Sequence, residues 1–155
     1  MKRKMTLFGF TLAVVGTVIA FAASSAYPSA TGRKAARLGT ASSSLGRIVV
    51  DSKGRTLYLF EKDKGRHSKC YGACAAYWPP ALTHGKPKAR SGLKRSLIGT
   101  TKRRNGSKQV TYAGHPLYRY AGDTGPGQTT GAGLQDFGGG WDPVSPAGKK
   151  VESGG

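Results

Sequence analysis

A short tyrosine-bearing segment occurs twice in this chain, and this repetition constrains the fold more than any other feature. Residues 54–63 and residues 114–123 share the pattern G-x-x-L-Y-x-(aromatic)-x-x-D. Further along each copy, a Trp-Pro-Pro sequence begins at Trp78 and a Trp-Asp-Pro sequence begins at Trp141. Two landmarks in the same order and at nearly equal spacing indicate duplication of one structural unit.

The repeats span about residues 45–82 and 97–146, and both are predicted to be rich in β-hairpins. In the first repeat, runs of β-branched and aromatic residues at 47–50 and 56–60 flank the turn-forming residues 51–54. Two strand-forming runs on either side of a short segment with Asp, Ser and Gly are typical of a hairpin.

The second repeat is predicted to be a three-stranded meander. Its runs at 97–103 and 108–112 flank the dipeptide Asn105-Gly106, which is the strongest short hairpin signal. A further tight connection then leads into a third strand at 117–120.

The predicted fold class is all-β, with the two repeats forming one small domain over residues 45–148 and a short helix or turn only within 68–77. The residues expected to fill its core are Tyr58, Phe60, Trp78, Tyr118, Tyr120 and Trp141. Successive strand residues point to opposite faces, so the aromatic residues of each strand share one face. The other face carries Leu59 in the first repeat and Arg119 in the second, and we expect it to be wetter. A ligand-stacking role for Trp78 and Trp141 is the alternative to core packing.

Each repeat places an aspartate just after its last aromatic residue, where a strand is expected to end. Asp63 and Asp123 are therefore predicted to accept backbone N–H groups in the following turns. Catalysis or metal binding by these carboxylates is the alternative. We find no nucleophile beside a base and no obvious acid–base pair, so the chain is predicted not to be an enzyme.

The N-terminus has the three parts of a secretory signal peptide over residues 1–26. A basic start is followed by an uncharged, mainly apolar run at 5–23 and then by small residues. The alternative is an uncleaved anchor helix. Export to the periplasm, the cell envelope or the medium follows from either reading. Residues 27–44 are predicted to be a flexible linker, and residues 149–155 a disordered tail.

The chain carries a formal net charge of +18, and a field of this size attracts polyanions. The cations expected to project together around the second-repeat hairpin tip are Lys102, Arg103, Arg104 and Lys108. Outside a cell their candidate partners are anionic envelope polymers and acidic lipid head groups. Specific nucleic-acid recognition is not expected, because no aromatic stacking platform lies between the basic residues. We expect a monomer that contacts a membrane only through an uncleaved N-terminus.

The two cysteines, Cys70 and Cys74, are predicted to form a disulfide, because cysteines of an exported chain usually pair. Closing so short a loop gives about 2 kcal/mol of stabilisation. The alternative is a copper or zinc site, or a thiol-redox pair, that uses both thiols and the imidazole of His67. In the disulfide reading the chain needs no cofactor.

The motif Y-x-(F/W/Y)-x-x-D resembles that of a family of bacterial secreted repeats and predicted lipoproteins of unknown function. It occurs at residues 58–63 and 118–123. The C-x-x-x-C segment at 70–74, the following Trp-Pro-Pro and the closing Trp-Asp-Pro are also similar to that family. The resemblance covers nearly the whole domain, from about residue 45 to 148. This chain has no cysteine near its signal sequence, so it departs from the lipid-anchored members. The resemblance implies an exported repeat protein and no particular activity.

Overall fold

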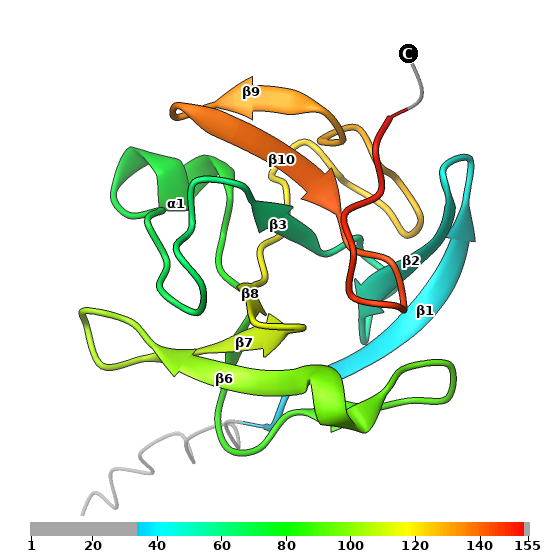
Figure 1. Cartoon of the computed structure of the whole chain (residues 1–155), viewed down its shortest axis with the longest axis horizontal. Helices are drawn as coiled ribbons and strands as arrows, with labels where there is room; N and C mark the ends of the chain where they lie inside the picture. The colour runs from blue at the N-terminus through cyan, green and yellow to red at the C-terminus, as the bar shows by residue number, and fades with distance from the viewer. Residues whose placement is uncertain (1–33, 154–155) are drawn as a thin grey trace, which may run out of the picture. The chain divides into compact units, whose positions relative to one another are not determined.

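The computed structural model describes residues 34–153, and most of its regular structure is β-strand (Figure 1). The strands are β1 (Arg37–Ser43), β2 (Gly46–Asp51), β3 (Tyr58–Phe60), β4 (Leu82–Thr83), β5 (Lys88–Ala89), β6 (Ile98–Lys102), β7 (Lys108–Tyr112), β8 (His115–Pro116), β9 (Leu134–Asp136) and β10 (Gly139–Pro143). The helical segments are α1 (Ala73–Tyr77) and the 3₁₀ turn η1 (Arg95–Leu97). The all-β prediction is therefore confirmed. The predicted signal peptide or anchor helix at 1–26 lies outside the described residues.

Three small sheets make up the domain. Their strand orders are β2-β1-β5, β3-β10-β9 and β4-β7-β6, and β8 pairs with β7 in the third sheet. The hairpin predicted at Asn105-Gly106 joins β6 to β7, as expected, with Lys102 opposite Lys108 at its end. No helix within 34–153 is long and apolar enough to cross a membrane.

The two repeats are interleaved and are not separate lobes. Strand β3 of the first repeat pairs with β10 of the second, so that Trp141 lies opposite Phe60. Strand β4 of the first repeat pairs with β7 of the second. At the centre, the N–H of Tyr58 donates to the carbonyl of Tyr118 at 2.9 Å, and the N–H of Tyr118 donates to the carbonyl of Tyr58 at the same distance. This reciprocal pair marks an approximate two-fold axis between the repeats.

The last segment of each repeat also forms backbone hydrogen bonds with the other repeat. The N–H of Ala81 donates to the carbonyl of Leu117 at 2.8 Å, and the N–H of Val144 donates to the carbonyl of Leu57 at 3.2 Å. Each tyrosine strand is therefore covered by the final segment of the other repeat. Neither repeat satisfies its backbone alone, so the two must fold together.

Two buried clusters flank the central strands. The first contains the aromatic residues and both cysteines: Tyr58, Phe60, Cys70, Cys74, Trp78, Tyr118 and Trp141. The second is mainly aliphatic and includes Leu57, Leu59, Val49 and Val110. The expectation of a wetter face beside Leu59 was wrong, because Leu59 is only 4% exposed. The strand is covered on both faces, and its counterpart Arg119 is accommodated by an ion pair with Asp51 at 2.7 Å.

Three local expectations need correction. Residues 37–44, expected to be part of a flexible linker, hold β1, which pairs with β2 from Leu38 to Ser43. Leu38 is the one buried side chain by which β1 contacts the aliphatic cluster, and backbone pairing with β2 holds the remainder of the strand in place. The first-repeat hairpin is correspondingly reduced, because β2 pairs with β1 and meets the following strand only at the Val50–Thr56 bridge. The tail expected from residue 149 is ordered as far as Val151, whose N–H donates to the carbonyl of Pro143 at 2.8 Å.

Candidate functional site

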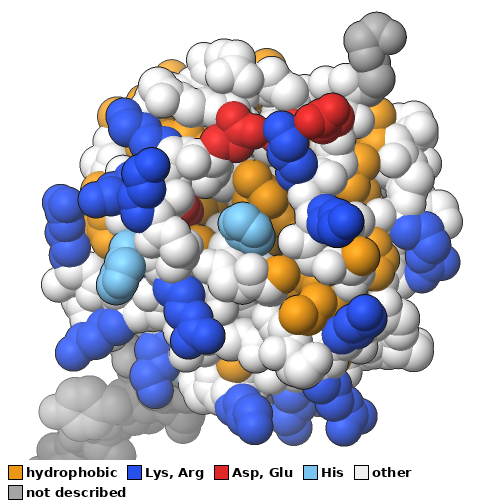
Figure 2. All heavy atoms as spheres, viewed as in Figure 1, with side chains coloured by type: hydrophobic (Ala, Val, Ile, Leu, Met, Phe, Trp, Pro, Cys, Tyr) orange, Lys and Arg blue, Asp and Glu red, His pale blue; other side chains and the backbone are white. Residues whose placement is uncertain are grey.

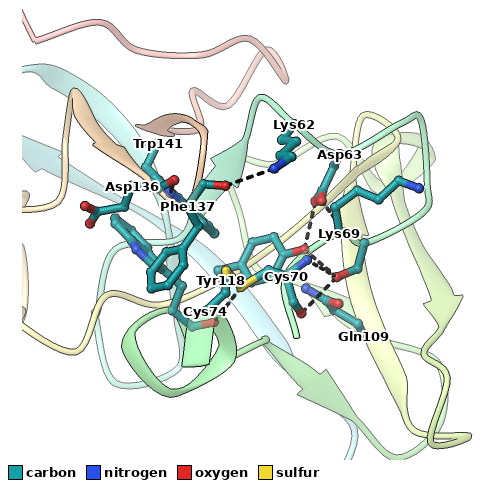
Figure 3. Close-up of a disulfide and its surroundings, with 12 residues drawn as sticks. Lys62, Asp63, Lys69, Cys70, Cys74, Gln109, Tyr118, Asp136, Phe137 and Trp141 are labelled. Atoms are coloured by element: carbon teal, nitrogen blue, oxygen red, sulfur yellow. Dashed lines mark hydrogen bonds between the residues drawn. A yellow bond between two sulfur atoms is a disulfide. The ribbon is translucent and has the colours of Figure 1, made fainter. Parts of the chain in front are cut away.

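The tyrosine and the aspartate of the repeated motif bond across the two repeats. The hydroxyl of Tyr58 in the first repeat donates to Asp123 Oδ2 in the second at 2.6 Å. The hydroxyl of Tyr118 in the second repeat donates to Asp63 Oδ2 in the first at 2.8 Å, as Figure 3 shows. The motif therefore functions as a pair, because each copy supplies the donor for the carboxylate of the other.

The second oxygen of each carboxylate caps a turn, as the sequence predicts. Asp63 Oδ1 accepts the backbone N–H of Lys69 at 2.7 Å. Asp123 Oδ1 accepts the backbone N–H of Thr130 at 3.0 Å and its hydroxyl at 2.6 Å. Both aspartates are thus fully used in holding loops to the central strands.

Burial is the main influence on the pKa of Asp63 and of the two motif tyrosines. Burial raises the pKa of Asp63 to about 6, although hydrogen bonds from Lys69 and Tyr118 and the charge of Arg103 act in the opposite direction. Burial together with the neighbouring carboxylates also raises the pKa of both tyrosine hydroxyls, at Tyr58 and Tyr118. The phenols therefore stay protonated and act as donors over the whole physiological range.

The tryptophans lie in the interior. Their rings stack with centroids 3.9 Å apart and an angle of 5° between planes. Phe60 stacks on the other side of Trp141 at 4.0 Å, and the partly buried Tyr120 tilts against Trp78 at 4.5 Å. Since both indoles are fully buried, they pack the core, and this arrangement offers no surface for a stacked ligand.

Cys70 and Cys74 form a disulfide buried in the aromatic cluster, as predicted (Figure 3). With both sulfurs bonded, neither is a thiolate that can bind a soft metal. The side chain of His67 is exposed, and its backbone pairs with that of Lys64. Among residues 34–153, no three His, Cys, Asp or Glu side chains lie close enough to hold a metal ion.

Arg103 does not project from the hairpin tip, and its assignment to a polyanion-binding group was wrong. Its side chain is 5% exposed. It donates to Gln109 Oε1 at 2.6 Å, to the Cys70 carbonyl at 2.6 Å and to Ser68 Oγ at 3.0 Å. The residue follows the end of β6, where the strand turns inward towards the disulfide loop. Its guanidinium is therefore a structural link between the hairpin and the loop at 68–74.

The other three cations of the predicted group are exposed, and we call Lys102, Arg104 and Lys108 the tip patch. The guanidinium of Arg104 lies 4.5 Å from the ring of Tyr71, and that of Arg103 lies 4.4 Å from the same ring. The ring of Tyr71 therefore contacts both guanidinium groups, and it holds the exposed Arg104 beside the buried Arg103. The tip patch is attached to a fixed part of the domain.

The acidic side chains offer this patch no counter-charge. The ion pairs of the described residues use only Arg55, Arg119 and Lys150 as cations. Lys and Arg side chains surround the face drawn in Figure 2, where acidic side chains are few. On the face drawn in Figure 2, positive side chains consequently outnumber negative ones.

Comparison with known proteins identifies the relatives of this fold. A family described as a secreted repeat of unknown function matches residues 39–82 and residues 99–145, which together make up more than half of the chain. The chain belongs to this secreted-repeat family. Its two matched segments correspond to the two repeats deduced from the sequence, and membership places the protein outside the cytoplasm, as predicted. No curated protein and no solved structure matches it significantly.

Sequence reasoning missed the contacts that cross between the repeats. The five-residue spacing of Tyr and Asp suggests a local contact, whereas in this chain each tyrosine bonds the aspartate of the other copy. It also missed the buried network around Arg103, because an arginine beside a hairpin turn is usually solvated. One signal was Gln109, a long polar residue directly before Val110 on the predicted strand 108–112.

Proposed function

We propose that this secreted-repeat protein binds anionic polymers of the cell envelope through its tip patch and does not catalyse a reaction. The observation that carries the proposal is that Lys102, Arg104 and Lys108 are exposed together on one hairpin and have no carboxylate partner among the described residues. Three unpaired cations on a fixed hairpin attract an anion with many charges more strongly than scattered, paired cations do.

The attachment of the hairpin supports the proposal. Strands β6 and β7 pair over five positions, and the network of Arg103 joins the end of the hairpin to the disulfide loop. A preordered cationic surface loses less conformational entropy on binding than flexible lysines do. A hairpin held in place in this way is expected of a surface that binds its ligand through charge.

The proposal is tested by the binding of a labelled long-chain polyphosphate, measured by fluorescence anisotropy at several salt concentrations. We expect binding at low ionic strength that weakens steeply between about 50 and 200 mM salt, because released counter-ions drive the association. The variant K102Q/R104Q/K108Q should bind about tenfold or more weakly, and its slope against the logarithm of salt concentration should fall by about three.

A matched control removes three exposed cations that do not belong to the β6–β7 hairpin. The variant K53Q/K64Q/R66Q changes the net charge by the same amount, at side chains for which the structure shows no ion pair. Its affinity should stay close to that of the unaltered protein. Lack of polyphosphate binding at low salt, or binding that is insensitive to salt, would remove the proposal. A parallel measurement with vesicles of acidic phospholipid distinguishes envelope polymer from lipid head group as the source of the anion.

A further inference from the structure

A second row of cations lies on the edge strand of the first sheet. In the extended stretch around β5, Lys86, Lys88 and Arg90 are exposed, whereas Pro87 between them is buried and Ala89 is partly buried. Alternating exposure is the pattern of a strand with one face in solvent. Residues two apart on such a face are about 6–7 Å apart, so the three charges form a regular row.

The neighbouring strand adds a fourth charge to this row. β5 pairs with β1 in parallel, and Arg37 is the register partner of Lys88. Both side chains are exposed. Like charges at adjacent positions on neighbouring strands repel each other, so this pairing destabilises the free protein. An anion bound between them would relieve the repulsion.

No acidic side chain among the described residues neutralises the row. Asp51 is the acidic residue that lines a hollow together with Lys88 and Arg90. Its carboxylate already accepts a hydrogen bond from Arg119 at 2.7 Å and lies 3.5 Å from Arg55. The first 50 residues of the chain contain no Asp or Glu, so the N-terminal segment carries no counter-charge either.

The surface beside the row is concave. Four hollows adjoin the row. Lys86 borders the first and the second, Lys88 borders the second and the third, and Arg90 borders the third and the fourth. The third hollow has a volume of about 680 Å³. The first hollow also reaches Lys108 of the tip patch. Successive hollows, each sharing a cation with the next, therefore lie from the β6–β7 hairpin along the edge of the first sheet. In Figure 2, Lys and Arg side chains also follow the lower rim of the visible face.

We infer that Lys86, Lys88 and Arg90, together with Arg37, form a binding track for an extended linear polyanion. We call these four residues the cation ladder. Their regular spacing fits a polymer whose anionic groups repeat along an extended chain, and fits a compact single anion poorly. The inference rests on the proposed function and extends it, because it specifies a linear ligand and the path of that ligand away from the tip patch.

The test compares a ladder variant, K86Q/K88Q/R90Q, with the control variant K53Q/K64Q/R66Q. Each loses two lysines and one arginine at exposed positions, so the net charges are identical. Binding of long-chain polyphosphate and of orthophosphate is measured for both variants and for the unaltered protein at low salt. Thermal unfolding checks that each variant is folded. A charge-retaining variant, K86R/K88R, guards against effects that come from altered packing.

We expect the ladder variant to bind long-chain polyphosphate about tenfold or more weakly, with a salt slope lower by about three, while K86R/K88R and the control change little. Orthophosphate should bind far more weakly than the polymer to every form. Equal weakening in the ladder and control variants would overturn the ladder and leave the proposed function intact. Equally tight binding of orthophosphate would also overturn it. If the unaltered protein binds no polyphosphate at low salt, the proposed function fails and the ladder fails with it.

Discussion

The hydroxyl of Tyr58 lies 2.6 Å from Asp123 Oδ2, although the two residues belong to different repeats. The second copy of the motif makes the complementary bond, from Tyr118 to Asp63. The motif therefore encodes half of an interface. A single copy would leave one buried phenol and one buried carboxylate without their partners, and this explains why two copies occur in one domain.

Removal of the Tyr58 hydroxyl should destabilise the domain without changing its shape. In Tyr58→Phe the ring still fills its place, but Asp123 loses a buried donor, so we expect a loss of about 1–3 kcal/mol in the free energy of unfolding. Urea denaturation measures it. Tyr77→Phe is the matched control, because Tyr77 is 60% exposed, and this change should cost less than about 0.5 kcal/mol. Equal stability of the two variants would show that the bond between repeats contributes nothing.

The raised pKa of Asp63 predicts a definite pH dependence. Burial raises the pKa of this carboxyl from 3.8 to about 6, so the folded protein binds a proton that the unfolded chain has already released between these values. Stability from this group is therefore greatest below about pH 4 and is lost as the pH rises to about 6. Relative to Asp63→Asn, the unaltered protein should lose stability over that interval, as urea denaturation at a series of pH values would reveal.

Asp51 provides a control with the opposite sign. Burial raises the pKa of Asp51, but the hydrogen bond and charge of Arg119 and the backbone N–H of Lys53 outweigh burial and hold the pKa below 3.8. Its contribution to stability is present above about pH 4 and is lost as the pH falls below that value. The difference between the unaltered protein and Asp51→Asn should therefore shrink on acidification. If both differences change in the same direction, the environments assigned to these carboxylates are wrong.

The sequence predicted the parts of the fold that depend on local chemistry. Asn105-Gly106 gave the hairpin because its turn conformation is set by two adjacent residues. Sequence patterns did not predict β1, because residues 37–43 contain one large apolar side chain and owe their structure to pairing with β2. The burial of Leu59 was missed for a related reason, because the segments that cover its face come from elsewhere in the chain. In the site, the two adjacent arginines 103 and 104 look equivalent in sequence and differ only through contacts with distant residues.

Reduction of the disulfide should weaken the domain and loosen the tip patch. Opening the short Cys70–Cys74 loop costs about 2 kcal/mol by chain entropy, and it frees the loop whose Cys70 carbonyl accepts a hydrogen bond from Arg103. Urea denaturation with and without reductant, beside C70S/C74S, measures the loss. The reduced protein also tests the metal alternative. Uptake of one copper or zinc ion per chain, abolished by His67→Ala, would favour metal handling over a purely structural role for the cysteines.

The repulsion between Arg37 and Lys88 predicts that a charge-removing substitution stabilises the protein. Lys88→Gln should raise the free energy of unfolding by about 0.2–1 kcal/mol at low salt, and the gain should vanish at about 1 M salt, where screening acts within a few ångströms. Thermal unfolding at two salt concentrations measures this. Lys64→Gln, which removes one exposed charge from another part of the surface, should give a smaller gain. Equal gains would mean that net charge, and not the cross-strand pair, is responsible.

Arg103 and Arg104 are adjacent in sequence, and the same substitution should destabilise the protein at the first and not at the second. Arg103→Lys cannot keep the bonds to Gln109, Ser68 and the Cys70 carbonyl with one ammonium group, so we expect a loss of about 1–3 kcal/mol in stability. Arg104→Lys keeps its charge at an exposed position and should change stability by less than about 0.5 kcal/mol.

Polyphosphate binding separates the roles of the two arginines further. Arg104→Gln should weaken binding and leave stability nearly unchanged, because its side chain is exposed and has no carboxylate partner within residues 34–153. Arg103→Lys, measured under conditions where it is fully folded, should bind polyphosphate more weakly at an unchanged salt slope, because its buried side chain does not reach the ligand but its network orders the tip patch. Binding by folded Arg103→Lys that equals binding by the unaltered protein would mean that the tip patch needs no support from this network.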